Sequence, residues 1–147
     1  MSTLQILQWN VQKSKKKAMS PLLDSGSQTY DIIAIQEPWL NPFTHTTYCP
    51  RQCNYHLVFP ENGRPRTCLL INKDIPRSQW TAGATPDYCW VRLTTASGTY
   101  TIHNIYSETP LSHVTQEWNS PVTEVLACIS PDEHHLIVGD FNLHHEA

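Results

Sequence analysis

Apolar residues in this chain fall in short runs that are typical of β-strands. Residues 31–36 are almost continuously apolar, which predicts a strand buried on both faces. The apolar run at residues 136–139 predicts a second buried strand near the end of the chain. Looser alternation of apolar and polar positions predicts further strands over residues 4–9, 55–59, 67–71, 88–94 and 99–106.

Turn signals join four of these strands in pairs. Asn62-Gly63 lies between residues 55–59 and 67–71, and an Asn-Gly pair is a strong predictor of a β-hairpin. Residues 96–98, which end in Gly98, predict a second hairpin between the strands on either side of them.

Helical spacing of apolar residues occurs in two places, residues 18–23 and residues 122–129. Pro21 either starts the first helix, with Ser20 as its cap, or kinks it. The resulting order is strand, helix, strand, hairpins, helix, strand. That order predicts an α/β fold with a mixed, partly antiparallel and helix-covered sheet.

The composition predicts one folded domain over residues 1–147. Hydrophobic residues make up 39% and charged residues 16% of the chain, which excludes the disordered class. No apolar run approaches the roughly 20 residues that span a bilayer, and residues 1–4 do not begin a signal peptide, so we expect an intracellular protein of the nucleus or cytoplasm with no membrane partner. The net charge of −3 gives no overall basic surface, and nucleic-acid binding would need a local patch.

The cysteines do not predict a disulfide framework or a zinc finger. There are five of them, and Cys49 and Cys53 have a zinc-like spacing without a second pair of ligands at finger spacing. We therefore expect free thiols.

Polar residues follow the predicted strands at their carboxyl ends. Asn10 and Glu37 end two strands, and Asp140 and Asn142 directly follow the run at 136–139. Ligands of open α/β sheets bind beyond the carboxyl ends of strands, and a carboxylate beside an amide suits a metal-bound or phosphate-bound oxygen. The alternative is that Gly-Asp-x-Asn only forms a turn.

Taken in order, four motifs resemble the motif series of the endonuclease/exonuclease/phosphatase superfamily: Gln8-Trp9-Asn10, Ile35-Gln36-Glu37-Pro38, Asn104-Ile105-Tyr106 and Gly139-Asp140-Phe141-Asn142. The first of them, and the Asp-Phe-Asn-Leu-His-His form at residues 140–145, are most similar to the endonuclease domains of non-LTR retrotransposons.

This resemblance implies a two-sheet α/β sandwich with mixed sheets. The last motif of the superfamily, which carries a catalytic histidine, has no counterpart here. We therefore expect residues 1–147 to be an incomplete domain without its C-terminal strands. The two histidine pairs at residues 134–135 and 144–145 are weaker candidates for a metal site, since adjacent side chains of a strand point to opposite faces.

The resemblance also implies the roles of individual residues. Glu37 matches the acidic ligand of a Mg²⁺ ion, which Mn²⁺ can replace, and Asn10 its neighbour at the same site. Tyr106 matches the tyrosine that contacts the scissile phosphate. Asp140 matches the aspartate that positions or deprotonates the attacking water, and Asn142 an amide that donates to a phosphate oxygen.

Nucleic-acid contacts are predicted next to this site. A run of lysines follows Asn10 and either binds phosphate groups or forms a solvated charged face: Lys13, Lys15 and Lys16. Trp39 either stacks on a base or caps the sheet.

The resemblance implies a Mg²⁺-dependent DNA endonuclease, impaired by the missing motif, whose full-length relatives carry a reverse transcriptase domain. One alternative is a non-catalytic remnant or binding module of that domain. Another is a phosphatase of the superfamily that acts on lipid or inositol phosphates.

Overall fold

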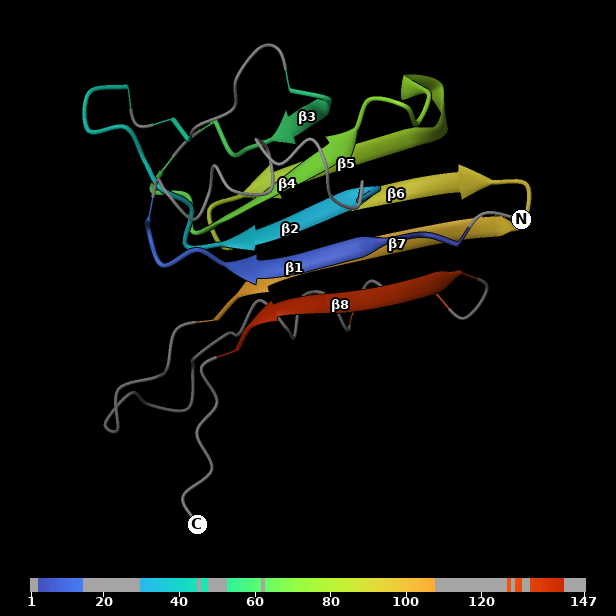
Figure 1. Ribbon diagram of the computed structural model, residues 1–147. Helices are drawn as coiled ribbons and strands as arrows, with labels where there is room; N and C mark the ends of the chain where they lie inside the picture. The colour runs from blue at the N-terminus through green and yellow to red at the C-terminus, as the bar shows by residue number, and fades with distance from the viewer. Residues whose placement is uncertain are drawn as a thin grey trace.

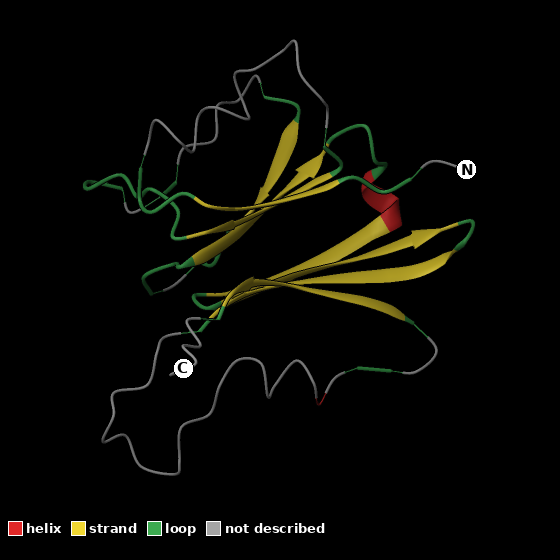
Figure 2. Cartoon of the chain, turned by 60° about the horizontal axis from the view of Figure 1, so that its bottom comes forward, coloured by secondary structure: helices red, strands yellow, loops and turns green. Residues whose placement is uncertain are grey.

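The computed structural model of the protein describes residues 3–14, 30–44, 46–47, 53–61, 63–107, 127, 129–130 and 133–141. These residues form two sheets of four strands each, which lie face to face as two layers (Figure 2). The expected two-sheet sandwich is therefore confirmed. Both sheets are mixed, with one parallel and two antiparallel strand pairs in each.

The first sheet has the strand order β1-β2-β4-β3. Its strands are β1 (Ile6–Asn10), β2 (Ile32–Gln36), β3 (Tyr55–Val58) and β4 (Thr67–Asn72). The strands β1 and β2 are parallel, and β4 runs antiparallel to both of its neighbours. The pairing of β3 with β4 confirms the hairpin that Asn-Gly predicts.

The second sheet has the strand order β5-β6-β7-β8. Its strands are β5 (Trp80–Thr85), β6 (Tyr88–Thr95), β7 (Gly98–Tyr106) and β8 (His134–Asp140), and the short 3-10 helix η1 (Arg77–Gln79) precedes β5. The pairs β5–β6 and β6–β7 are antiparallel, which confirms the second hairpin, and β7 and β8 are parallel.

A hydrophobic core fills the space between the sheets. It takes Ile32 and Ala34 from β2, alternate residues of β4 and β6, among them Val91, and Ile102 from β7. The intervening residues of β2, Ile33 and Ile35, pack in a second cluster on the outer face of the first sheet. All five residues of β2 are buried, so the strand predicted to be buried on both faces is confirmed.

One strand was missed from the sequence, and the burial predicted for another was wrong. The strand β5 was not predicted, because its central residues Ala82, Gly83 and Ala84 carry little of the β-branched and aromatic signal of a strand. The run at residues 136–139 does form a strand, but Leu136 is 44% exposed. The reason is that β8 has only one neighbour in the described sheet, and thus only part of its surface is covered.

Both predicted helices fall outside the described residues, apart from residues 127 and 129. Within the part of the chain that the structure describes, no helix is long and apolar enough to cross a lipid bilayer. Cys53, Cys68 and Cys89 are buried free thiols, as predicted, and Cys49 lies outside the described residues.

Candidate active site

Four strands end at the same edge of the sandwich. Figure 1 shows the arrowheads of β1, β2, β7 and β8 pointing to one end of the molecule. In the first sheet Asn10 is the register partner of Gln36, the residue before Glu37, and in the second sheet Tyr106 is the partner of Asp140. The parallel pairs therefore bring together the strand ends that carry the predicted site residues.

A hydrogen bond joins the two sheets at this edge. The Nδ2 of Asn10 donates to the Oδ2 of Asp140 at 2.7 Å, and the Oδ1 of Asn10 accepts from the backbone N–H of Gln12 at 2.9 Å. The amide of Asn10 is thus held from both sides, and it fixes one carboxylate oxygen of Asp140.

Glu37 leaves its strand through a left-handed turn. Its φ is 50°, and Gln12 and Lys13 have φ values of 52° and 59°, which is uncommon for residues other than glycine. Two hydrogen bonds hold this conformation: the backbone N–H of Glu37 donates to the carbonyl of Arg66 at 2.8 Å, and the N–H of Lys13 donates to the carbonyl of Glu37 at 2.8 Å. A left-handed backbone conformation costs a residue other than glycine about 1 kcal/mol or more, and it tends to occur at functional sites.

The turn sets Glu37 in the wall of a cavity of about 870 Å³. Tyr106 lines the same cavity from the second sheet, and Trp39 and Lys13 line it from the loops after β2 and β1. Of the predicted residues, the structure therefore brings Glu37, Tyr106, Trp39 and Lys13 to one cavity, while Asn10 and Asp140 meet beside it.

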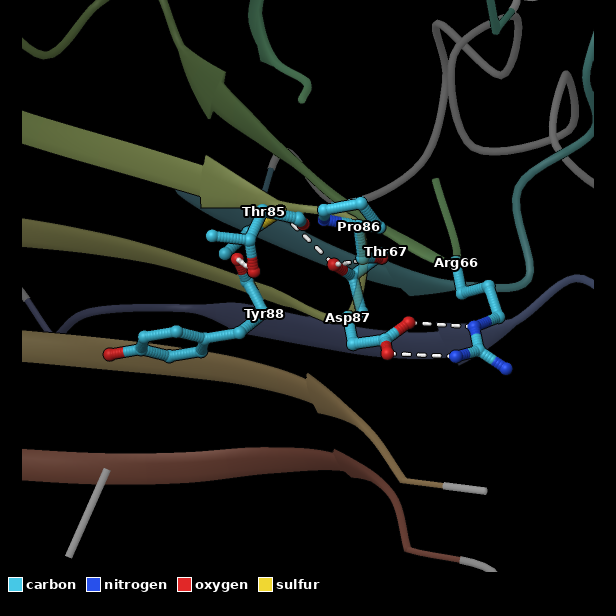
Figure 3. A network of polar contacts seen from close by, with 7 residues as sticks. Arg66, Thr67, Thr85, Pro86, Asp87 and Tyr88 are labelled. Atoms are coloured by element: carbon cyan, nitrogen blue, oxygen red, sulfur yellow. Dashed lines mark hydrogen bonds and ion pairs between the residues drawn. The ribbon is translucent and has the colours of Figure 1, made fainter. Parts of the chain in front are cut away.

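An ion pair between Arg66 and Asp87 lies next to Glu37 and Tyr106. The guanidinium of Arg66 donates two hydrogen bonds to the carboxylate of Asp87, at 2.6 and 2.7 Å (Figure 3). The Cζ of Arg66 lies 4.9 Å from the ring centroid of Tyr106. The backbone carbonyl of Arg66 accepts from Glu37, and that of Asp87 accepts from the N–H of Tyr106 at 2.9 Å. One pair of residues thus contacts the strand ends of both sheets.

Buried amides form a second bridge below the site. Gln36 is fully buried, and its Nε2 donates to the Oδ1 of Asn104 at 2.7 Å, across the space between the sheets. The Nδ2 of Asn104 donates to the carbonyls of Ile35 and Cys68 at 3.0 and 2.8 Å. Since buried polar groups are costly unless they are paired, this network specifies how the sheets align.

Gly139 lets the ends of β7 and β8 approach each other. Its φ is 152°, and a Cβ at this position would lie 2.0 Å from the backbone oxygen of Ile105. Its carbonyl accepts from the Nε2 of Gln8 at 3.2 Å. Position 139, which directly precedes Asp140, therefore excludes every residue with a side chain.

A chain of aromatic hydrogen bonds lies on the second sheet. The backbone N–H of Ser130 donates to the Nε2 of His135 at 3.4 Å, and a hydrogen bond of 2.9 Å joins the Nδ1 of His135 to the Nε2 of His103. A hydrogen bond of 2.6 Å joins the Nδ1 of His103 to the hydroxyl of Tyr88. Burial, together with the neighbouring His135, lowers the pKa of His103 to about 4.

Several predicted residues cannot be placed at the site. Asn142, Lys15 and Lys16, and the pair at residues 144–145, lie outside the described residues. His134 stacks on Tyr100 with ring centroids 4.9 Å apart, while His135 bonds to His103, so the two neighbours do face different groups. Among the described residues no group of three or more His, Cys, Asp or Glu side chains could hold a metal ion.

Sequence reasoning missed the residues that brace the site. Arg64, Arg66 and Asp87 were not singled out from the sequence. A usable signal exists for the pair: Arg66 and Asp87 each stand directly beside a proline, Pro65 and Pro86, immediately before a strand. Gln36 and Asn104 belong to the quoted motifs, yet the hydrogen bond between their side chains was not predicted.

Comparison with known proteins identifies what this arrangement resembles. A model described as "Endonuclease/Exonuclease/phosphatase family" matches residues 7–147. No curated protein matches the chain. Among 17 matching chains of solved structures is the "Endonuclease domain of TRAS1, a telomere-specific non-LTR retrotransposon", with 15% sequence identity and a TM-score of 0.50. The match covers 72% of this chain and 48% of that one, so this chain spans about half of its length, and the likeness is one of fold.

Proposed function

This chain belongs to the endonuclease/exonuclease/phosphatase family, and on that premise we propose that it is a divalent-metal-dependent phosphodiesterase that cleaves DNA. One observation carries the proposal. The hydrogen bond between Asn10 and Asp140 joins the two sheets beside a cavity that Glu37 and Tyr106 line. The match to an endonuclease domain supports DNA as the substrate.

The donor set fits a hard divalent cation such as Mg²⁺, or Mn²⁺ in its place. Mg²⁺ takes oxygen ligands, keeps several waters and needs only one or two carboxylates, so a site without three clustered protein ligands is compatible with it. Glu37 would hold the ion through its carboxylate, with the amide oxygen of Asn10 at the same site. When bound, the ion would supply stabilisation of the negative charge on the phosphoryl oxygens.

Asp140 is the group that we assign to the attacking water. Because Asn10 donates to one of its carboxylate oxygens, Asp140 is held in orientation at the end of β8, and a carboxylate can accept a proton from a water or orient it. Asn142, two residues further along, would donate to a phosphate oxygen.

Tyr106 is the group that we assign to the phosphate. A phenol hydroxyl is a neutral donor, and such donors stabilise the charge that develops on phosphoryl oxygens. The guanidinium of Arg66 over the ring restrains the side chain, and the backbone N–H of Tyr106 is held by Asp87. The site therefore offers an oriented acceptor on one side and an oriented donor on the other.

DNA would lie across this edge of the sandwich. Lys13 is exposed at the cavity, and Lys15 and Lys16 follow it in the chain, so a phosphate backbone would meet a local cluster of cations despite the net negative charge of the chain. Trp39 lines the same cavity and offers a base a flat apolar surface.

Two measurements test the proposal. Calorimetric titration with MgCl₂ and with MnCl₂ should show binding that Glu37→Gln removes and Glu61→Gln, a change of an exposed carboxylate outside the cavity, leaves intact. Nicking of supercoiled plasmid should require the cation, and Asp140→Asn should reduce it about 10²- to 10⁴-fold, the usual contribution of a positioned acid or base.

Two results would contradict the proposal. Cation binding that survives Glu37→Gln would move the metal site elsewhere. Hydrolysis of inositol or lipid phosphates without plasmid nicking would assign the chain to the phosphatases of the family.

A further inference from the structure

A second groove lies between the edge strands of the two sheets, β3 and β5. Each of these strands stands at the end of its sheet and pairs with one neighbour among the described residues, β3 with β4 and β5 with β6. The two strands contact each other across the layers, in the upper part of Figure 1. The groove between them, which we call the edge groove, has a volume of about 560 Å³. It shares only Pro86 with the lining of the cavity beside Glu37.

The outer edge of β5 has none of the features that prevent strand pairing. Its sequence, Trp-Thr-Ala-Gly-Ala-Thr, contains no charged residue and no proline, and its pairing with β6 is continuous from Trp80 to Thr85. In an antiparallel pair, every second residue directs its N–H and C=O away from the neighbouring strand. Such a row of backbone groups is a template for one more strand.

The walls of the edge groove are apolar. Residues 57–60 line it from the first sheet, and Ala82 and Ala84 line it from β5. Because alanine side chains are short, the groove has room for larger apolar side chains beside them. Trp80 also lines the groove; it is 6% exposed, and its indole N–H has no acceptor among the described residues. Since buried donors are rarely left unpaired, this N–H favours a ligand that brings a carbonyl.

Charges of opposite sign mark the two ends of the edge groove. The Cζ of Arg77 lies 3.8 Å from the ring centroid of Trp80, the first residue of β5. Glu61 belongs to the other end, because Gly63, two residues further along, meets Pro86 just after β5: a Cβ on Gly63 would lie 2.9 Å from the Cγ of Pro86. Arg77 and Glu61 are exposed, and neither forms an ion pair with another described residue.

We propose that the edge groove binds an extended peptide segment of a partner protein, which adds to β5 as a further strand of the second sheet. Antiparallel strand pairs outnumber parallel pairs roughly two- to three-fold, and we assign the peptide that orientation. It then places a basic residue opposite Thr85, near Glu61, and an acidic residue opposite Trp80, near Arg77. Its residues opposite the two alanines are large and apolar, and they fill the groove.

The same features disfavour a second copy of this chain as the occupant. A second β5 in antiparallel orientation would bring complementary charges, but it would place only alanine opposite Ala82 and Ala84 and would leave the apolar walls uncovered. In recognition by strand addition, main-chain hydrogen bonds give affinity and pockets for alternate side chains give specificity. The edge of β5 supplies the first of these, and the apolar walls and end charges of the edge groove supply the second.

Synthetic peptides test the proposal without a cleavage assay. The probe is a fluorescein-labelled peptide with blocked ends, Lys-Leu-Thr-Leu-Thr-Glu, and fluorescence anisotropy measures its affinity. One comparison peptide exchanges the terminal Lys and Glu, and another replaces both leucines by alanine. Two more carry N-methyl groups on alternate residues, one in each of the two possible phases. N-methylation of the residues whose N–H groups face β5 blocks strand addition, whereas N-methylation of the intervening residues does not.

The matched protein variant exchanges the charges of the edge groove, as Arg77→Glu together with Glu61→Lys. Arg77 also donates to the carbonyl of Trp80 at 2.7 Å, so the melting temperature of the variant is measured as well. A gain of affinity for the charge-exchanged peptide cannot come from loss of folding, which keeps the test decisive. The control is Lys73→Glu, a change of an exposed cation after β4 that lies outside the groove.

The wild-type protein and Lys73→Glu should bind the probe about tenfold more tightly than the charge-exchanged or the alanine peptide. The double variant should prefer the charge-exchanged peptide, and only one of the two N-methylated peptides should bind. Equal affinity for the probe and the charge-exchanged peptide, equal binding of the two N-methylated peptides, or no binding of the probe would each overturn the proposal. Sedimentation that shows a dimer, lost in Arg77→Glu, without peptide binding would assign the edge to a second copy and refute it as well. None of these results bears on the proposed nuclease function.

Discussion

The ion pair between Arg66 and Asp87 should couple the two sheets at the candidate site. Its two hydrogen bonds are 2.6 and 2.7 Å long, and the backbones of the same two residues accept the N–H groups of Glu37 and Tyr106. Replacing Asp87 by Asn keeps the size of the side chain and removes its charge. We expect the fold to lose stability and Tyr106 to lose its restraint.

The magnitude follows from geometry and exposure. A hydrogen bond to a charged group contributes about 1.5–3 kcal/mol when shielded, whereas an exposed ion pair contributes about 0–1 kcal/mol. The side chains of Arg66 and Asp87 are 30% and 33% exposed, and their contact is bidentate. We therefore expect a coupling energy of about 1 kcal/mol, intermediate between the two limits.

A double-mutant cycle measures this coupling. Urea unfolding of Arg66→Gln, Asp87→Asn and the double variant isolates the pairwise free energy. Arg92 and Glu133 form a control pair, with Arg92 49% exposed, and their coupling should stay below about 0.5 kcal/mol. Arg66→Lys should recover little of the coupling, because an ammonium group cannot reproduce the two parallel contacts. A coupling for Arg66–Asp87 no larger than that of the control pair would refute the reasoning.

Two further predictions concern acid and steric sensitivity. The pKa of His103 is about 4 in the folded protein and 6.5 in the unfolded chain, so the unfolded state binds more protons between these pH values. The free energy of unfolding should therefore fall by up to about 3 kcal/mol as the pH drops from 6.5 to 4. Unfolding at several pH values should show that His103→Gln flattens this dependence, and an unchanged slope would assign it to other groups. Gly139→Ala should destabilise the fold by more than about 3 kcal/mol or prevent folding, because the added Cβ would meet the carbonyl of Ile105. In Gly98→Ala the added Cβ would meet only the side chain of His134, at 3.7 Å, and the change should cost about 1 kcal/mol. Similar melting temperatures for the two variants would contradict this.

Burial is the main reason why His103 resists protonation, and the neighbouring His135 adds to it. The Nε2 of His103 is hydrogen-bonded to the Nδ1 of His135 at 2.9 Å. Tyr88 faces the opposite ring nitrogen, and Glu133 lies beside His135 at 3.9 Å rather than beside His103. No carboxylate therefore contacts His103 among the described residues.

Much of the fold was predictable because strand periodicity is local. The buried run that became β2 and the two hairpins follow from patterns of a few residues each, and the resemblance of four ordered motifs to the family is confirmed by the match over residues 7–147. The strand β5 was not predicted because its central residues, Ala82, Gly83 and Ala84, carry no strand pattern of their own. Their small size is explained by the side chains that they pack against in the folded protein. Gly83 is the clearest case, since the indole nitrogen of Trp90 lies 2.6 Å from where its Cβ would be.

For the candidate site, the sequence predicted only which residues stand at the ends of strands. The motifs supplied Asn10, Glu37, Tyr106 and Asp140, because polar residues directly after apolar strands stand out in a sequence. How those ends are held was not predictable. Arg66 and Asp87 are 21 residues apart, and Gln36 and Asn104 are 68 apart, so neither contact leaves a local pattern.

The supporting contacts also explain why the motif residues include amides beside carboxylates. A carboxylate at a strand end is hydrated and mobile unless a donor holds it, and an amide is a donor without a charge that would compete for a cation. Asn10 meets this need for Asp140, and the buried Gln36–Asn104 pair aligns the two sheets that carry them. Because Glu37 directly follows Gln36, the bridge that aligns the sheets also fixes the start of the left-handed turn. Replacing either buried amide should therefore disturb the site through the alignment of the sheets, although neither side chain lies in the cavity.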